Sequence, residues 1–328
     1  MKSYFIFILT FALIFLASCN KGSNPISGSN EIIDWEGNYP LVNTACNDSI
    51  LFSSDRYIGT SYAPSVYIMH KSGSGIHSLT NHMFTFGASW SPRRWKIIFI
   101  GDSSFGKSLR GLYVMNSNGT NIKRLTPEGE DVYGIAAWSP DGNRIAYTEI
   151  DTTDPYGRGR IKVINPDGTD EKTLTDWFGG LRRVTWSPDS RKIIFGGFEY
   201  MSGDKLYIIN SDGTGLAVLF EYYEGCYSPS WSPDGTLVAF SSFALIDGNY
   251  YSKIFTYNMN TYDIKQVSTG KTFDYNPTWS SDSKIILFAS NPPGISGKSS
   301  IYRINKDGSD LIQLTDSLGT DYNASWFR

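Results

Sequence analysis

Short apolar runs alternate with polar turn residues along most of this chain. Around Trp90, for example, strands are expected up to Trp90 itself and then at 96–100, 111–115 and 122–125. Runs of this length, bounded by Gly, Pro, Asn and Asp, are typical of β-strands. The pattern recurs with a tryptophan at 90, 138, 186, 231, 279 and 326, in steps of 48, 48, 45, 48 and 47 residues. Such a period indicates four-stranded propeller blades rather than helical repeats of about 34 residues.

The turns between the expected strands repeat as well. Trp138 is followed by Ser-Pro-Asp-Gly, and the third strands lead into Asn-x-Asp-Gly at 165–168, 210–213 and 305–308. Asp-Gly supplies the positive φ angles of a tight hairpin at low steric cost. The fourth strands end on Leu-Thr at 125–126, 174–175 and 314–315.

Together these motifs resemble the WD40-like repeat of TolB-type six-bladed β-propellers, over roughly residues 43–327. The resemblance implies an all-β fold, with six blades of four antiparallel strands. Strands two to four each occur six times, but both 39–43 and 322–326 are candidates for the first strand of the first blade. We expect the C-terminal strand with Trp326 to complete that blade, because this joins the chain ends and removes open sheet edges.

The repeated tryptophans are predicted to be structural wedges between blades. Side chains alternate across a strand, so each tryptophan and the residue before it point to opposite faces. All six preceding residues are small, which leaves room for the indole of a neighbouring blade. The predicted wedges are Trp90, Trp138, Trp186, Trp231, Trp279 and Trp326, preceded by Ser89, Ala137, Thr185, Ser230, Thr278 and Ser325.

The N-terminus is predicted to be a targeting signal. Lys2 precedes an apolar run from Tyr4 to Ala17, which ends at Leu-Ala-Ser-Cys19. This order resembles the bacterial lipoprotein signal, and the resemblance implies cleavage after residue 18 and lipidation of Cys19. We expect a signal peptide at 1–18, a lipidated Cys19 and tether at 19–38, and the propeller at 39–328, anchored in the cell envelope on the periplasmic or outer side. A plain secretory signal or an N-terminal membrane anchor is the alternative.

Composition and motif context argue against several classes of ligand. With 29 Lys and Arg against 32 Asp and Glu, the net charge of -3 gives no basic excess for nucleic acid. Residues 101–108 fit the phosphate-loop pattern, but a strand follows where that loop needs a helix, so no nucleotide is expected. The histidines His70, His77 and His82 lack zinc-site spacing, and the Asn-x-Asp-Gly turns lack the full oxygen set of a calcium loop. No metal or cofactor is therefore expected.

The two cysteines after Cys19 are predicted to remain separate thiols. Cys46 and Cys226 belong to the first and fourth repeats, which a six-membered ring places on opposite sides. A disulfide needs Cα atoms within about 7 Å.

Candidate binding residues belong to the side of the ring that carries the longer connections. Strands alternate in direction, so the loops after strands two and four share one face, and this face has many aromatic residues. Amphipathic rings with nearby arginines are typical of recognition surfaces for protein or glycan. The predicted partner-binding residues are Tyr133, Tyr156, Arg158, Trp177, Arg182, Tyr200, Tyr223, Tyr250, Phe273, Tyr275 and Tyr322. Many of these rings would equally suit packing between blades.

The sequence thus predicts a monomeric, non-catalytic envelope propeller that binds a protein or glycan partner. An exported lyase or hydrolase is the alternative, and it requires acidic groups that converge at the channel mouth. Its candidates are Asp131, Glu224, Asp274 and Asp321, which precede first strands. A purely structural module of an envelope assembly is a third possibility, because a fold alone does not fix a function.

Overall fold

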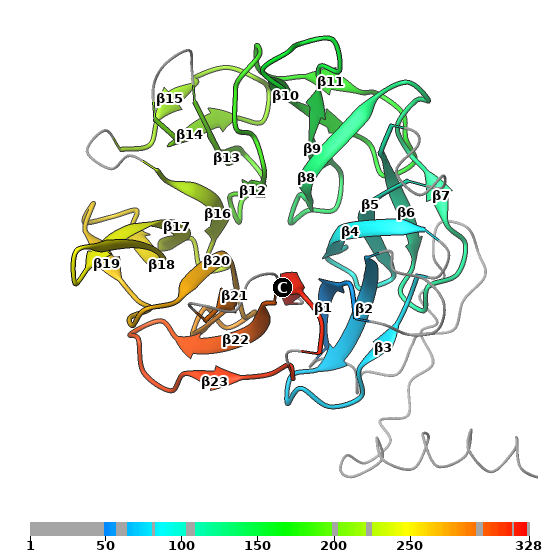
Figure 1. The fold of residues 1–328 in the computed structure, drawn as a ribbon. Helices are drawn as coiled ribbons and strands as arrows, with labels where there is room; N and C mark the ends of the chain where they lie inside the picture. Colours follow the sequence, from blue (N-terminus) through cyan, green and yellow to red (C-terminus); the bar gives the residue numbers. More distant parts are fainter. Residues whose placement is uncertain are drawn as a thin grey trace, which may run out of the picture. The chain divides into compact units, whose positions relative to one another are not determined.

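In a computed structural model of the chain, the structure describes residues 49–56, 64–80, 83–102, 109–198, 203–220, 225–292, 298–316 and 318–326. Within these residues, six four-stranded antiparallel sheets are arranged in a ring (Figure 1). The predicted six-bladed all-β fold is confirmed. No described residue belongs to a helix long and apolar enough to cross a membrane.

The blades follow one another along the chain, and each of blades 2 to 6 begins with its innermost strand, whereas the innermost strand of blade 1 is the last strand of the chain. Blade 1 consists of β24 (Asp321–Trp326), β1 (Ser49–Ser54), β2 (Ser65–His70) and β3 (His77–Ser78). Blade 2 consists of β4 (Phe84–Trp90), β5 (Lys96–Asp102), β6 (Gly111–Asn116) and β7 (Lys123–Arg124). Blade 3 consists of β8 (Asp131–Trp138), β9 (Ile145–Ile150), β10 (Gly159–Ile164) and β11 (Lys172–Thr173).

The second half of the ring has the same strand order. Blade 4 consists of β12 (Val184–Trp186), β13 (Lys192–Gly197), β14 (Lys205–Asn210) and β15 (Ala217–Val218). Blade 5 consists of β16 (Tyr227–Trp231), β17 (Leu237–Ile246), β18 (Asn249–Asn258) and β19 (Ile264–Gln266). Blade 6 consists of β20 (Phe273–Trp279), β21 (Ile285–Asn291), β22 (Ser300–Asn305) and β23 (Ile312–Gln313).

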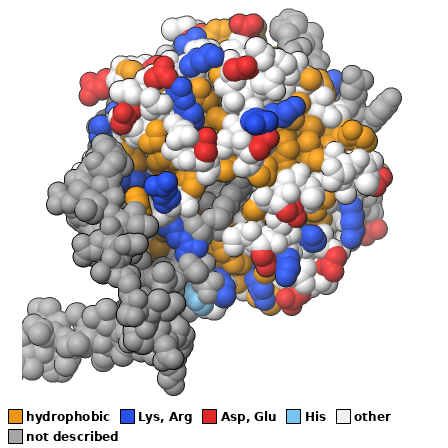
Figure 2. Space-filling model, turned by 180° about the vertical axis from the view of Figure 1, so that it is seen from behind, with side chains coloured by type: hydrophobic (Ala, Val, Ile, Leu, Met, Phe, Trp, Pro, Cys, Tyr) orange, Lys and Arg blue, Asp and Glu red, His pale blue; other side chains and the backbone are white. Residues whose placement is uncertain are grey.

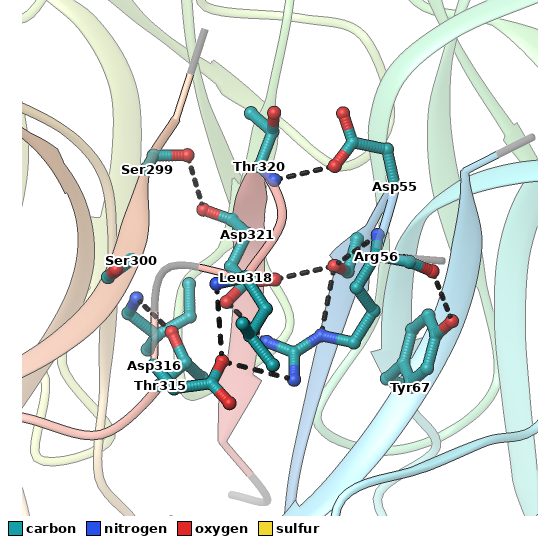
Figure 3. A network of polar contacts seen from close by, with 12 residues as sticks. Asp55, Arg56, Tyr67, Ser299, Ser300, Thr315, Asp316, Leu318, Thr320 and Asp321 are labelled. Atoms are coloured by element: carbon teal, nitrogen blue, oxygen red, sulfur yellow. Dashed lines mark hydrogen bonds and ion pairs between the residues drawn. The ribbon is translucent and has the colours of Figure 1, made fainter. Parts of the chain in front are cut away.

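The C-terminal strand closes the ring, as predicted. β24 pairs antiparallel with β1, with Ile50 opposite Trp326, so the red end of the chain lies against its blue beginning (Figure 1). The fully buried Asp321 carboxylate accepts from Ser54 Oγ at 2.5 Å and pairs with Arg56 Nη2 at 2.6 Å (Figure 3). Thr320 N also donates to Asp55 Oδ1 at 2.6 Å. Closure therefore combines a strand ladder with a charge-assisted contact between the two ends.

Aromatic pairs fill the space between blades. In five blades, a phenylalanine of the second strand stacks on an aromatic residue of the third strand at 5.5 to 6.0 Å: Phe52 on Tyr67, Phe99 on Tyr113, Phe195 on Tyr207, Phe240 on Phe255, and Phe288 on Tyr302. Blade 3 departs from this pattern, because its corresponding pair is Tyr147 and Lys162.

The tryptophans fall into two groups. Trp186, Trp231, Trp279 and Trp326 are buried, while Trp90 and Trp138 are partly exposed. The indole of Trp186 donates to Ala137 O, and that of Trp279 donates to Ser230 O, both at 3.0 Å. Each acceptor is the small residue that precedes the tryptophan of the previous blade. Trp186 and Trp279 thus lie between blades as a wedge requires.

The connection between the second and third strands of blade 5, at residues 243–250, is the end of a long hairpin and not an irregular loop. β17 and β18 pair over ten residues each, and the turn lies at Asp247-Gly248 with φ of 48° and 78°. Positive φ at both central positions is the geometry of a type I′ turn, which matches the twist of paired strands. The Asp-Gly dipeptide was therefore a hairpin signal at this position as well.

Several expectations fall outside the described residues. They include Cys19 and the tether, the candidate first strand at 39–43, Cys46, His82, Tyr200, Tyr223 and Glu224, and most of the phosphate-loop pattern at 103–108.

Candidate functional site

Bulges interrupt the pairing of the innermost strand with its neighbour in five of the six blades, and blade 4 is the exception. The pairing of first and second strands shifts register after Phe86, Tyr133, Tyr227 and Tyr275, and between Leu51 and Ser53 opposite β24. Bulges re-aim side chains and often lie beside functional sites. Four residues before the tryptophan, or five in blade 3, the blades carry Phe86, Tyr133, Arg182, Tyr227, Tyr275 and Tyr322, which we name the axial ring.

Members of the axial ring lie close to one another around the axis. Phe86 and Tyr133 contact edge to face, with ring centroids 6.5 Å apart. The pKa of Tyr322 is raised to about 12, mainly by burial and to a smaller extent by electrostatic interaction with Asp55, Tyr275 and Tyr133. Burial likewise raises the pKa of Tyr227, and the positive charge of Arg182 partly offsets this rise. Tyr227 and Tyr322 are therefore neutral hydrogen-bonding groups at physiological pH.

Exposure varies around the axial ring. Tyr133 is 39% exposed and Arg182 is exposed, whereas Tyr275 and Tyr322 are half-buried. Tyr133 lies under the Arg110 guanidinium at 4.8 Å, and Tyr275 donates to Asn291 Oδ1 at 2.9 Å. Rings held in this way lose little conformational entropy when a partner binds.

A polar layer follows the axial ring along the innermost strands. Ser228 Oγ donates to Asn276 Oδ1, and Asn276 Nδ2 donates to Asn323 Oδ1, both at 2.6 Å. All three residues have φ between 52° and 57°, in the left-handed region. In blade 2 the corresponding residue is Gly87 at φ 64°, where a Cβ atom would lie 2.7 Å from Gly134 O. The innermost strands therefore approach closely at this level.

Other predicted binding residues lie further from the axis. Tyr156 is 78% exposed, and the nearby Arg158 pairs with Asp154 at 3.0 Å. Trp177 is 37% exposed and lies against the Arg160 guanidinium at 4.7 Å.

The hairpin of blade 5 carries a second exposed group. Phe243, Leu245 and Tyr250 are 50%, 62% and 68% exposed, and Leu245 is paired with Tyr250 across the hairpin. On the hairpin's other side, Tyr251 contacts Phe273 at 5.4 Å. Apolar side chains also reach the surface between charged groups on the face drawn in Figure 2. Exposed apolar patches are typical of interaction sites.

The three acidic candidates that the structure describes, Asp131, Asp274 and Asp321, do not converge. Asp131 is bound by Arg110 Nη2 at 2.5 Å in blade 3, and Asp321 by Arg56 in blade 1. Asp274 in blade 6 is buried against Lys253 at 2.8 Å, and it also accepts from Ser268 and Ser290. Each of the three carboxylates thus pairs with a cation in a separate part of the ring. The pairs of Asp131 and Asp274 join neighbouring blades, the pair of Asp321 joins the two chain ends within blade 1, and the three carboxylates do not form one group.

A charged cluster replaces the aromatic pair of blade 3. Lys162 Nζ lies 2.7 Å from Glu130, 3.3 Å from Glu149 and 2.5 Å from Glu171, and its side chain is 4% exposed. The Tyr147 hydroxyl donates to Glu171 at 2.6 Å. Burial would lower the pKa of Lys162, but hydrogen bonds to Glu130 and Glu171 outweigh it and raise that pKa. The ammonium group therefore remains charged.

The carboxylates of this cluster differ. Burial raises the pKa of Glu130 despite its bond to Lys162, and Glu130 Oε2 is buried with no hydrogen-bond donor among the described residues. Burial would also raise the pKa of Glu171, but bonds from Lys162 and Tyr147 hold it below its usual value. Glu130 is thus the first of these two to take up a proton as the pH falls.

In the part of the chain that the structure describes, no group of three His, Cys, Asp or Glu residues could hold a metal ion. Cys226 is a buried thiol whose pKa burial raises to about 12. Such a thiol is chemically inert at neutral pH.

Comparison with known proteins finds a family of similar repeats over the C-terminal part of the chain. Residues 198–328 match the model of the TolB beta propeller domain. The resemblance to TolB-type propellers is thereby confirmed. The structure of TolB from Acinetobacter baumannii superimposes with a TM-score of 0.72 over 86% of this chain and 67% of that chain, at 16% identity, which shows a shared fold.

Two curated proteins match shorter stretches of this TolB-like propeller. Dipeptidyl-peptidase 5 from Porphyromonas endodontalis is 29% identical over 112 residues, which cover 33% of this chain and 16% of that protein. The Tol-Pal system protein TolB from Gluconobacter oxydans is 36% identical over 83 residues, which cover 23% and 17%. The chain thus spans about a sixth of the length of the curated relatives it matches.

Sequence reasoning missed two members of the axial ring, Phe86 and Tyr227. Both could have been found by counting back four residues from Trp90 and Trp231. Because only the alignment of repeats reveals this register, a search for aromatic residues in loops alone does not reach them.

Proposed function

We propose that this TolB-like propeller is a non-catalytic, lipid-anchored protein of the cell envelope, and that it binds a protein partner around its axial ring. The observation that carries the proposal is the recurrence of five aromatic residues and one arginine, one from each blade, at equivalent positions of the repeat, with Phe86 and Tyr133 in edge-to-face contact between neighbouring blades. Tyr and Arg are enriched in the residues that dominate protein interfaces. The exposed hairpin residues Phe243, Leu245 and Tyr250 extend the same apolar and aromatic composition outward.

The pairing of the acidic residues supports a binding role over catalysis. Asp131, Asp274 and Asp321 are each held by a cation, so none is placed to act as a general acid or base near the others. Lipid anchoring at Cys19 and the envelope location rest on the N-terminal sequence and on the similarity to TolB.

Site-specific photocrosslinking in the native envelope tests the proposal. A photoreactive amino acid replaces Tyr133, which is 39% exposed in the axial ring, or Ile122, which is 40% exposed beside the outermost strand β7. We expect a discrete protein adduct from position 133 and none from position 122. A glycan adduct at position 133 would show that the partner is a glycan and not a protein. Equal adducts at both positions, or none at 133, would contradict binding at the axial ring.

A further inference from the structure

A pocket lies at the opposite end of the innermost strands from the axial ring. It has a volume of about 310 Å³ and is lined by the ends of these strands and the Ser-Pro turns that follow them. Prolines of four blades contribute to the walls, together with three of the six repeated tryptophans, Trp90, Trp138 and Trp326. This volume is within the range of small-molecule sites, and walls of aromatic rings and prolines are rigid and largely preformed.

The three tryptophans belong to consecutive contacts around the ring, where blade 6 meets blade 1, blade 1 meets blade 2 and blade 2 meets blade 3. In the wedge arrangement, each tryptophan is matched with the small residue that precedes the tryptophan of the previous blade, as the indole of Trp186 donates to Ala137 O at 3.0 Å. The pocket is lined by both members of three such pairs, Trp326 with Thr278, Trp90 with Ser325, and Trp138 with Ser89.

The small residue of each of these three pairs carries a hydroxyl group. The hydroxyls of Ser89, Thr278 and Ser325 form no hydrogen bond with another described residue. A serine or threonine hydroxyl can both donate and accept a hydrogen bond. In a pocket with mostly apolar walls, a few polar groups of this kind fix the orientation of a ligand.

Trp138 supplies a second donor to the pair that it forms with Ser89. Its indole nitrogen is buried and donates to no described residue, whereas the indoles of Trp186 and Trp279 donate to backbone carbonyls of the neighbouring blade. A buried donor without a partner costs free energy, and an acceptor in the pocket would recover it. The pair of Ser89 and Trp138 is therefore the point of the lining where an acceptor gains most.

The charges of the lining argue against an ionic ligand. Arg183, in the segment leading into β12, is the one charged side chain among the described residues that line the pocket. It is 8% exposed, and its Nη1 donates to Pro277 O at 3.0 Å across the ring, so its guanidinium is engaged in contacts of the protein itself. No carboxylate belongs to the described lining that could pair with a cation. Burial of an ion without a partner of opposite charge costs far more than burial of a neutral polar group.

We propose that this pocket binds a small, neutral, mostly apolar molecule with one carbonyl group, whose hydrocarbon or aryl part lies between the tryptophans and whose carbonyl oxygen accepts from Ser89 Oγ and Trp138 Nε1. A carbonyl oxygen has two lone pairs and can accept both bonds. The site is separate from the axial ring, so its occupancy does not depend on the proposed partner.

Calorimetric titration of the full-length protein with three probes of one skeleton tests the charge preference without any substitution. The probes are 4-phenylbutan-2-one, 3-phenylpropionate and 3-phenylpropylammonium, which are neutral, anionic and cationic. We expect the ketone to bind roughly tenfold more tightly than either ion, because the ions lose their hydration without a free counter-charge. Binding of either ion as tightly as the ketone, or no saturable binding of the ketone at millimolar concentration, would overturn the proposal.

Two substitutions then locate the carbonyl group, with propylbenzene as a probe that has no acceptor. Trp138→Phe retains an aromatic wall and removes the N–H, and Ser89→Ala removes the hydroxyl. Each should weaken binding of the ketone about fivefold, the effect of one hydrogen bond, and leave binding of propylbenzene unchanged. Trp177→Phe removes an indole that lies against the Arg160 guanidinium outside the lining, and it should change neither affinity.

The comparison of the two probes separates a lost hydrogen bond from a damaged pocket. If Trp138→Phe and Ser89→Ala weaken both probes equally, or weaken neither, the carbonyl group does not lie at this pair and the proposal is wrong. Ser89→Ala is a change of one oxygen atom at a partly exposed position, so it provides the test even if Trp138→Phe fails to fold.

Discussion

Blades 2 and 3 are neighbours with the same strand order, yet they differ where their second and third strands face the preceding blade. Blade 2 places Phe99 against Tyr113 there, stacked at 5.5 Å with an interplanar angle of 11°. Blade 3 places Tyr147 beside Lys162, surrounded by three glutamates. The same backbone therefore accepts either an apolar pair or a charged cluster in which a buried cation is paired with carboxylates.

The two fillings should respond differently to pH. Stacked aromatic rings stabilise by burial of apolar area, which does not depend on protonation. The charged cluster contains Glu130, whose pKa is raised, and Glu171, whose pKa is lowered. Its contribution to stability must therefore change with pH through linkage.

The largest effect is expected from Phe99→Ala in blade 2. Phe99 is fully buried, and its removal leaves a cavity against Tyr113 and blade 1. Truncation of a buried phenylalanine costs about 3–5 kcal/mol. Urea denaturation should give the same loss at pH 7 and pH 5. A loss that differs between the two values of pH would show that the aromatic pair is coupled to titrating groups.

Lys162→Met in blade 3 should cost slightly less, about 3 kcal/mol at pH 7, because it leaves buried carboxylates without their cation. The loss should not be larger, because Arg160 still pairs with Glu149 and so neutralises one of the three carboxylates. The loss should shrink at pH 5, where an unpaired carboxylate takes up a proton.

Lys123→Met is the matched control for Lys162→Met. The Lys123 amine donates to Asp167 O at 3.1 Å in an exposed position, so this change should alter the free energy of unfolding by less than about 0.5 kcal/mol. Equal losses for the two lysine variants would mean that the buried cluster has no special role.

The alignment of repeats predicts the aromatic filling but not the charged one. The tryptophan recurs in all six blades and Asp-Gly turns occur in four of them, because both belong to the backbone geometry of the repeat, so they predicted the six blades and the closing strand. Lys162 occupies the position of an aromatic residue in the other five blades, and its partners Glu130, Glu149 and Glu171 come from separate connections and strands. Single-sequence patterning does not reveal that these charges meet.

The same limit applies to the candidate sites. Tyr133, Arg182, Tyr275 and Tyr322 were expected on the loop-rich face, and the axial ring brings them together with Phe86 and Tyr227. The pocket was not expected, because Trp90 and Trp138 carry the same motif as the buried Trp186 and Trp279. The motif alone therefore does not tell whether a repeated tryptophan packs between blades or lines a pocket.

Tyr147→Phe should have a smaller effect, about 1 kcal/mol, because it removes the hydroxyl that donates to Glu171 and leaves the ring in place. Tyr113→Phe in blade 2 is its counterpart, since that hydroxyl donates to no described residue, and it should be close to neutral. Thermal unfolding of both variants at pH 7 gives the comparison. A larger loss from Tyr113→Phe than from Tyr147→Phe would contradict the assignment of the hydrogen bond to the cluster.

The smallest effect at pH 7 is expected from Glu130→Gln, which removes a buried charge but also one bond to Lys162. What distinguishes Glu130→Gln is how its free energy of unfolding, relative to that of the unsubstituted protein, depends on pH. The raised pKa of folded Glu130 means that the folded state binds its proton first, so stability rises as the pH falls from that pKa toward the usual value of 4.5. Glu171 has the opposite sign: its contribution is present above 4.5 and is lost as the pH falls through its lowered pKa.

The unsubstituted protein should therefore gain stability relative to Glu130→Gln between neutral pH and about 4.5, and the difference should level off below that value, where Glu130 is protonated in both the folded and the unfolded state. Urea denaturation at intervals from pH 7 to pH 4 measures this difference directly, and subtraction cancels the other carboxylates, including Glu171. A difference that stays flat with pH would mean that water or a neighbouring group already stabilises the Glu130 carboxylate. Blade 3 would then resemble blade 2 in its response to pH, although its filling is charged.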